Sequence, residues 1–163
     1  MTKAPDGVDT GWGSHQPALH AFAKFREIKS VIEFGAGAFS THLFLDREVF
    51  PDLKALVTFE HKGNWASQVW VDDARLTLII TAPSNFKELS TNAKADFVFL
   101  DCAPLDTRNE LIPHVLSLAP IFAVHDCVPK DLSEYGFKYV KGANSKIQTV
   151  FASNTVDLGG LGL

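Results

Sequence analysis

Short runs of apolar residues alternate with longer amphipathic stretches along the chain. Several runs are apolar at successive positions, which is typical of strands that are covered on both faces of a sheet. The stretches between them carry apolar residues at helical spacing. This alternation predicts an α/β fold, in which a largely parallel sheet carries helices on both faces. The seven predicted strands are 31–34, 56–60, 76–80, 96–101, 121–125, 137–141 and 147–153.

Polar residues that favour helix starts precede the amphipathic stretches. Ser14 is the expected N-cap of the first helix. In the fifth stretch Thr107 and Glu110 match a capping box. A helix that starts there would contain Pro113, at a cost of ~3 kcal/mol. We therefore expect this helix to start near Asn109, which places Pro113 close to its first turn.

The last two predicted strands are joined by only five residues, 142–146. A crossover between parallel strands needs a dozen residues or more, so these two strands are expected to pair as an antiparallel hairpin. The expected architecture is therefore a doubly wound, seven-stranded mixed sheet with the hairpin at one edge.

The composition fits one folded domain. The chain has 163 residues, of which 46% are hydrophobic and 21% are charged. A chain of this length buries enough surface to fold without a disulfide or a structural metal. We expect a single domain over 1–163, with an N-terminal arm at 1–14 and a flexible tail at 154–163.

Charge and cysteine content disfavour several classes of function. The formal net charge of −4 argues against a large non-specific contact with a nucleic-acid backbone. No apolar run approaches the ~18–20 residues that span a membrane, and the N-terminus lacks the apolar stretch of a signal peptide. Cys102 and Cys127 are too few for a disulfide framework, so we expect reduced thiols in a cytoplasmic protein.

The strongest local signal is the sequence VIEFGAGAFST, between the first strand and the second helix. Gly35 and Gly37 allow a tight turn and a close approach of a ligand to the backbone. Such a loop binds a dinucleotide, a phosphate or a carboxylate, or is only a turn. Ser40 stands where the dinucleotide fingerprint has glycine or alanine, which weakens the case for NAD. Glu60 ends the second strand, where it either accepts the hydroxyls of a ribose or is solvated.

The order and spacing of these motifs resemble the class I S-adenosylmethionine (SAM)-dependent methyltransferases. The resemblance extends from about Val31 to Ser153. It comprises Glu33 before the two glycines, acidic residues that end the second and fourth strands, and the closing hairpin. It implies a Rossmann-like sheet with strand order 3-2-1-4-5-7-6, in which strand 7 is antiparallel, and it implies SAM as the cofactor.

The resemblance also implies cofactor contacts by position. The glycine loop would surround the methionine part of SAM, Glu60 would hold the ribose, and His61 and Ala82 would border the adenine. Asp101 would lie near the sulfonium group. Phe39 departs from the family, which often has a third glycine there. The implied cofactor-binding residues are Glu33, Gly35, Ala36, Gly37, Ser40, Glu60, His61, Ala82 and Asp101.

The loops after the fourth and fifth strands carry the candidate catalytic residues, because ligands of such sheets bind at the carboxyl ends of the strands. His125 is either a general base, with Asp101 as the second catalytic residue, or a buried histidine at a strand end. Arg108 and Asp126 are candidate substrate-binding residues, Arg108 as a clamp for an anionic group. Asp126 follows His125 directly and is expected to point to the opposite face.

We expect no metal in this site. Asp101 and Asp126 supply only two hard ligands, and Cys127 stands where catechol-type O-methyltransferases have asparagine. Two carboxylates and a thiol make a poor Mg²⁺ site.

The favoured function is transfer of a methyl group from SAM to an oxygen or nitrogen of a small molecule. The chain is short for this family, so the active site is expected to be either open or completed by a second subunit, in a homodimer or with a partner. The alternative function is a SAM-binding module or degenerate homologue without transferase activity. An NAD(P)-linked oxidoreductase is disfavoured. Trp12, His15 and Gln16 form either a lid over the cofactor or an arm on the surface, and Trp65 is expected only to pack.

Overall fold

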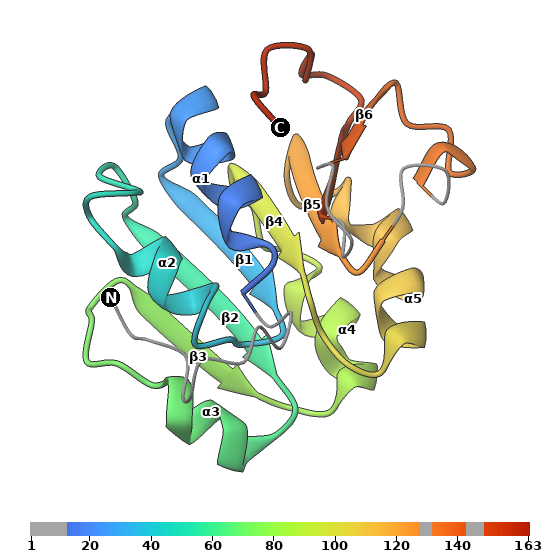
Figure 1. Cartoon of the computed structure of the whole chain (residues 1–163). Helices are drawn as coiled ribbons and strands as arrows, with labels where there is room; N and C mark the ends of the chain where they lie inside the picture. The colour runs from blue at the N-terminus through green and yellow to red at the C-terminus, as the bar shows by residue number, and fades with distance from the viewer. Residues whose placement is uncertain (1–12, 128–131, 143–148) are drawn as a thin grey trace.

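The computed structural model describes residues 13–127, 132–142 and 149–163. Its centre is a seven-stranded sheet with the order β3-β2-β1-β4-β5-β7-β6, which confirms the predicted order (Figure 1). Strands β1 to β5 are parallel, and β7 is antiparallel to both of its neighbours, β5 and β6. The strands are β1 (Ser30–Phe34), β2 (Ala55–Glu60), β3 (Leu76–Ile80), β4 (Phe97–Leu100), β5 (Ile121–His125), β6 (Tyr139–Gly142) and β7 (Thr149–Ser153).

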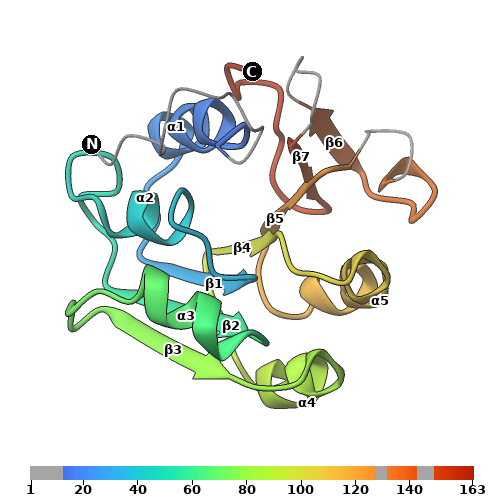
Figure 2. The ribbon, with the colours of Figure 1, turned by 60° about the horizontal axis from the view of Figure 1, so that its bottom comes forward.

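Helices cover both faces of the sheet, as the sequence predicted (Figure 2). The first three lie on one face, and the last two lie on the other. They are α1 (Gln16–Phe25), α2 (Thr41–Leu45), α3 (Gly63–Val69), α4 (Phe86–Ser90), which follows the short 3₁₀ helix η2 (Pro83–Asn85), and α5 (Leu105–Val115). No helix within the described ranges is long and apolar enough to cross a membrane.

Alternate residues of each strand face opposite sides, so the sheet divides the core into two apolar clusters. Phe97 and Phe151 belong to the cluster under α1 and α2, whereas Val98 and Phe122 belong to the cluster under α4 and α5. Phe22 anchors α1 to the first cluster, with its ring centroid 4.3 Å from that of Phe97 and 5.2 Å from that of Phe151. Burying one such ring contributes about 1.5–3 kcal/mol.

The start predicted for the fifth helix is wrong. α5 begins at Leu105 rather than near Asn109, and the N–H of Thr107 donates to the carbonyl of Pro104 in its first turn. Pro113 therefore lies inside the helix, in its last turn. The helix tolerates it because the apolar residues around it are buried against the sheet, and their combined burial outweighs one lost backbone hydrogen bond. These residues are Leu111, Ile112, Val115 and Leu118.

The chain from 154 to 163 is packed, in contrast to the flexible tail expected from the sequence. Leu158 and Leu161 are buried in the same cluster as α1. Lys141 donates from Nζ to the carbonyl of Gly159, at 3.1 Å. The two leucines bury apolar surface, although the glycine-rich composition of this segment suggested a flexible tail. Positions 1–12 of the expected arm, including Trp12, and positions 143–148 of the hairpin lie outside the described residues.

Candidate active site

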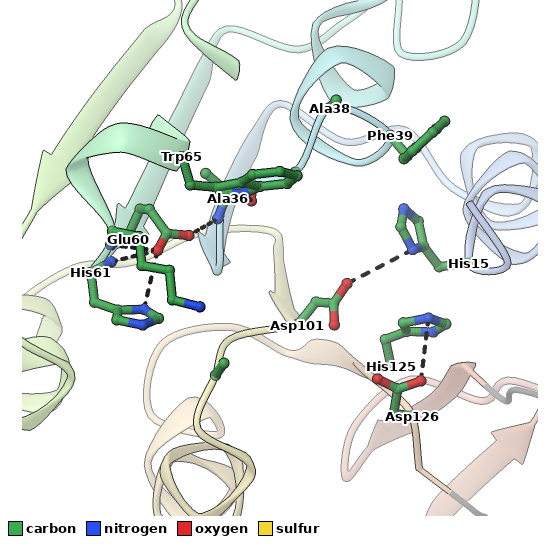
Figure 3. A pocket seen from close by; sticks show the side chains of 13 residues that line it. His15, Ala36, Ala38, Phe39, Glu60, His61, Trp65, Asp101, His125 and Asp126 are labelled. Carbon is green, nitrogen blue, oxygen red and sulfur yellow. Dashed lines mark hydrogen bonds and ion pairs between the residues drawn. The ribbon is translucent and has the colours of Figure 1, made fainter. Parts of the chain in front are cut away.

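A cavity of about 460 Å³ lies at the carboxyl ends of the central strands (Figure 3). Both its volume and its place are typical of ligand sites in open α/β sheets. Its wall combines residues from the loops after β1, β2, β4 and β5 with one residue that precedes α1. The lining residues are His15, Ala36, Gly37, Ala38, Phe39, Glu60, His61, Lys62, Trp65, Asp101, Ala103, His125 and Asp126.

The turn after β1 requires glycine at one position. Gly35 has φ +96°, and a Cβ atom there would lie 2.5 Å from the carbonyl oxygen of Asp101. Any side chain would therefore push β1 and β4 apart at their carboxyl ends. Gly35 does not line the cavity, but it lets the following residues, Ala36 and Gly37, form its wall.

Glu33 supports this loop from behind. The hydroxyl of Thr41 donates to Oε2 of Glu33 at 2.7 Å, and the hydroxyl of Thr58 donates to the same oxygen at 2.8 Å. Thr41 in turn accepts the N–H of Gly37 at 3.0 Å. Burial raises the pKa of Glu33 to about 7, although the surrounding hydroxyls oppose this rise. Glu33 is therefore an internal support of the loop rather than a wall residue.

Glu60 joins the loops after β1 and β2. Its Oε2 accepts the N–H of Ala36 at 3.0 Å, and its Oε1 accepts the N–H groups of His61 and Lys62 at 2.7 and 2.8 Å. A carboxylate oxygen can accept two hydrogen bonds, so Oε2 retains capacity for a ligand donor. The side chain is only 4% exposed, which fixes its position on the cavity wall.

Trp65 is a wall residue that the sequence analysis missed. It lies on α3, and its indole N–H donates to the carbonyl of Ala36 at 2.6 Å (Figure 3). The sequence did place Trp65 five residues after Glu60, close to the carboxyl end of β2. Its orientation toward the glycine loop follows only from the packing of α3. We call Ala36, Gly37, Glu60 and Trp65 the glycine-loop end of the cavity.

The opposite wall, which we call the histidine end, consists of His15, Asp101, His125 and Asp126 (Figure 3). Arg108 lies behind this wall and does not line the cavity. Its guanidinium donates to Asp101 Oδ1 at 2.9 Å, to Asp126 Oδ2 at 3.2 Å and to the carbonyl of His125 at 2.7 Å. Arg108 is thus paired inside the protein, as a buried guanidinium must be, and its contact with an anionic group of a substrate stays a prediction.

His125 ends β5 with its ring held at both nitrogens. Nδ1 lies 3.0 Å from the hydroxyl oxygen of Thr149, and Nε2 lies 3.1 Å from that of Ser14. Burial lowers the pKa of His125, which favours the neutral imidazole. Ser14, expected to cap α1, thus contacts His125 instead, while His15 occupies the N-cap position.

Asp126 does not point to the opposite face, as expected from its place after His125. Its φ of +54° lies in the left-handed region, which aspartate tolerates better than most residues. This conformation returns the carboxylate to the cavity, with Oδ1 3.6 Å from Nε2 of His125. Burial raises the pKa of the neighbouring Asp101 to about 7, although Arg108 opposes this rise.

His15 is neither a lid nor an arm on the surface. It is only 2% exposed, its Nδ1 lies 3.9 Å from Oδ2 of Asp101, and its ring centroid lies 5.0 Å from that of His125. Neither of its ring nitrogens has a hydrogen-bond partner among the described residues. Burial and the nearby His125 together lower the pKa of His15 to about 4, although the backbone of Phe39 and the carboxylate of Asp126 oppose this fall.

The structure thus brings together seven of the predicted site residues and leaves the others off the wall. The seven wall residues are Ala36, Gly37, Glu60, His61, Asp101, His125 and Asp126. Ala82 is exposed at the start of η2 and does not line the cavity. The residues that act behind the wall are Glu33, Gly35, Ser40 and Arg108. Cys102 is buried, and burial raises the pKa of its thiol to about 12.

No protein-family model and no curated protein sequence match this chain. Solved structures do match. Human methyltransferase-like protein 13, in complex with SAH, has a TM-score of 0.63 at 15% identity, with 86% of this chain and 81% of that chain covered. The N-methyltransferase NodS from Bradyrhizobium japonicum, also in complex with SAH, has a TM-score of 0.61 at 11% identity, with 93% and 90% covered.

The O-methyltransferase TomG from Streptomyces achromogenes, in complex with SAM, has a TM-score of 0.59 at 15% identity, with 94% of this chain and 91% of that chain covered. At such low identities the similarity concerns the fold. The chain has the Rossmann-like fold of the class I SAM-dependent methyltransferases.

Proposed function

We propose that this protein is a SAM-dependent methyltransferase that transfers a methyl group to an oxygen or nitrogen of a small-molecule acceptor. The observation that carries the proposal is Glu60, whose buried carboxylate links the glycine loop to the end of β2 on the wall of the cavity. The three neighbours described above have the same fold and were solved with SAM or SAH.

The residues of the glycine-loop end fit SAM. Glu60 Oε2 retains the capacity to accept a ribose hydroxyl, and Trp65 and His61 offer flat side chains beside the position of a base. Ala36 and Gly37 form a wall without bulky side chains, so a ligand can approach the backbone. SAM supplies an electrophilic methyl group on a sulfonium, which is a good leaving group.

The histidine end would then receive the acceptor. With the proton on Nδ1, His125 donates to the hydroxyl of Thr149 and directs the lone pair of Nε2 toward Ser14 and the cavity. This nitrogen would take the proton of the acceptor hydroxyl or amine. Asp101 would lie beside the reacting groups, and Asp126 would contact the acceptor. Arg108 holds both carboxylates in place.

The first test is calorimetric titration of the protein with SAM, SAH and NADH. We expect SAM and SAH to bind and Glu60→Ala to weaken both by roughly 1–3 kcal/mol, the effect of losing hydrogen bonds that involve a charged group. Glu88→Ala, which removes an exposed carboxylate on α4, is the matched control and should bind as the wild type does. Equal affinity for NADH, or an unchanged affinity in Glu60→Ala, would contradict the proposal.

Glu60 also accepts backbone N–H groups, so its loss can disturb the loop itself. Glu60→Gln retains one carbonyl oxygen as an acceptor, and the melting temperature of each variant separates loss of fold from loss of binding.

The second test is formation of SAH in the presence of hydroxyl and amine acceptors. Binding of SAM without SAH formation from any acceptor would support the alternative, a SAM-binding module without transferase activity.

A further inference from the structure

Three metal-ligating side chains meet at the histidine end. One ligand atom of each of His15, Asp101 and His125 lies within 4.8 Å of the other two. They come from three separate parts of the chain, namely the residue before α1, the loop after β4 and the end of β5. Figure 3 shows the three side chains directed toward one another across one side of the cavity.

His15 provides an independent sign of a missing ligand. Its side chain is almost fully buried, yet neither ring nitrogen has a hydrogen-bond partner among the described residues. A buried polar group without a partner costs roughly 1–3 kcal/mol, and proteins avoid this cost wherever a partner is within reach. The ring nitrogen Nδ1 faces Oδ2 of Asp101 at 3.9 Å, which is beyond a hydrogen bond but close enough for one ion to bridge both atoms.

We propose that His15, Asp101 and His125 form a binding site for a divalent first-row transition-metal ion such as Zn²⁺. Ligand atoms at about 2.0–2.1 Å from a tetrahedral zinc ion lie about 3.3 Å from one another. The observed ligand atoms lie within 4.8 Å of one another, so metal binding would require the side chains to move closer together. The fourth coordination position faces the cavity and is open to water or to a ligand.

The ligand set selects the class of metal. Two imidazoles and one carboxylate suit zinc, iron, cobalt or nickel, whereas Mg²⁺ and Ca²⁺ require oxygen ligands. This site is distinct from a magnesium site built on Asp101 and Asp126, for which the sequence offered too few hard ligands. Nothing in the sequence linked His15 to the other two residues, because it lies far from both of them along the chain.

The surroundings hold two of the ligands in position. Thr149 contacts Nδ1 of His125 at 3.0 Å, which fixes the ring, and Nε2 would bind the metal in exchange for its 3.1 Å contact with the Ser14 hydroxyl. Arg108 contacts Oδ1 of Asp101 at 2.9 Å and leaves Oδ2 toward His15. The positive charge of Arg108 is shared with Asp126, so the two carboxylates and the guanidinium together keep a negative charge that favours a cation.

Co²⁺ is the probe for this site, because its visible absorption reports nitrogen and oxygen coordination while it occupies zinc sites. We expect wild-type protein to bind one Co²⁺ per chain with absorption bands of low-symmetry coordination, and Zn²⁺ to displace it while Mg²⁺ does not. His15→Ala should weaken binding by at least about 10–100-fold, since loss of even an outer partner of a ligand has that effect. Thr149→Val, which removes such an outer partner, should weaken it by about 10–100-fold.

The matched control is His20→Ala, which removes an exposed imidazole from α1, the helix that follows His15. It should bind Co²⁺ as the wild type does. The melting temperature of each variant is also measured without metal, to detect loss of fold. Thr149→Ser keeps the hydroxyl and should bind Co²⁺ with the affinity of the wild type. Absence of the visible bands, or equal binding by His15→Ala and the wild type, would overturn the site. Loss of binding in His61→Ala alone would place the ion at the other end of the cavity and overturn it as well.

The effect of the ion on activity rests on the proposed function. A bound ion takes the Nε2 lone pair of His125, so Zn²⁺ should suppress methyl transfer and EDTA should restore it. Acceleration by Zn²⁺ would contradict this suppression. A protein that binds Co²⁺ but transfers no methyl group with or without EDTA would refute the proposed function and leave the metal site standing. A protein that transfers methyl groups but binds no Co²⁺ would refute the metal site alone.

Discussion

The two ends of the cavity differ in how completely their polar groups are satisfied. At the glycine-loop end, the carboxylate of Glu60 is bound by three neighbouring N–H groups. At the histidine end, His15 has no partner for either ring nitrogen among the described residues, and burial raises the pKa of Asp101 to about 7. The carboxylate at the glycine-loop end is therefore held in a fixed position before any ligand binds. The histidine end keeps one buried side chain, His15, without a hydrogen-bond partner among the described residues, and it holds groups whose pKa values are shifted by burial, as is common at functional sites.

The largest effect is expected from His125, which tests the histidine end as the chemical half of the cavity. His125→Ala should lower the rate of methyl transfer by ~10²–10⁴-fold, the usual contribution of a general base. The affinity for SAM should remain nearly unchanged, because the glycine-loop end is intact in this variant. Single-turnover kinetics and calorimetry on the same preparation measure the two effects.

His20→Ala is the control for loss of an imidazole at an exposed position, and it should leave both quantities as in the wild type. If His125→Ala loses SAM affinity in step with its activity, His125 is a structural residue and the two ends are not separable. Unchanged turnover would mean that another group takes the proton.

Arg108→Met should have the next largest effect, on stability. It removes the cation that Asp101 and Asp126 share and leaves two carboxylates close together without it. Breaking the largely buried pair of Arg108 and Asp101 costs about 3–5 kcal/mol, and the half-exposed Asp126 adds little to this cost. Arg26→Met, at an exposed position, should change the free energy of unfolding by less than about 0.5 kcal/mol. Urea denaturation measures the free energy of unfolding of both variants. Equal values would show that the ion pairs of Arg108 do not stabilise the histidine end.

Gly35→Ala tests the point where the two ends meet, because a Cβ atom there would contact the backbone of Asp101. We expect a loss of roughly 2–4 kcal/mol, from the left-handed conformation and the backbone clash together. Gly136 also has a positive φ, +73°, but a Cβ atom there would meet nothing within 4 Å. Gly136→Ala should therefore lose only about 1–2 kcal/mol, from the conformation alone. Equal losses in thermal melts would contradict the close approach at Gly35.

The smallest effect concerns Glu33 and the pH dependence of stability. Burial raises its pKa to about 7 in the folded protein, whereas an unfolded glutamate has its ordinary pKa of 4.5. Between these values the folded state binds more protons than the unfolded state, so stability falls as the pH rises. One such group contributes a slope of at most ~1.4 kcal/mol per pH unit.

Glu33→Gln keeps an acceptor for Thr41 and Thr58 and should flatten this part of the stability profile. Asp101, whose pKa burial also raises, adds to this slope, whereas His15 and His125, whose pKa values burial lowers, oppose it. The Glu33 contribution is therefore the difference between the variant and the wild type. Glu27→Gln, an exposed substitution, should leave the profile unchanged. Denaturant midpoints of the three proteins are measured across the pH range. If Glu33→Gln leaves the slope of stability against pH unaltered, Glu33 does not contribute to that slope.

The sequence predicted the glycine-loop end far better than the histidine end. Gly35 and Glu60 each end a strand in a local pattern, and the parallel register of β1 and β2 then brings the two loops together. His15 meets Asp101 and His125 only through the packing of α1 across the sheet, and no local pattern reports such a distant contact. Trp65 was missed for a similar reason, since the orientation of a short helix depends on its neighbours.

The observed bounds of α5 change the surroundings of Arg108. A helix that starts near Asn109 would leave Arg108 just before the helix. The actual start at Leu105 places Arg108 in the helix, where it faces the sheet and both carboxylates. The intrinsic cost of Pro113 within a helix did not predict where α5 begins, because the burial of the helix against the sheet outweighs that cost.

The packing of the last residues against α1 has a consequence for the order of folding during synthesis. Phe22 contacts Phe151 of β7, and Leu161 is buried in the same cluster. Ribosomes add about 5–20 residues per second, and contacts of such large sequence separation form late. Phe22 also packs against Phe97 of β4, so part of the apolar side of α1 can be covered early, and its packing is completed only after β7 and the last residues have been made.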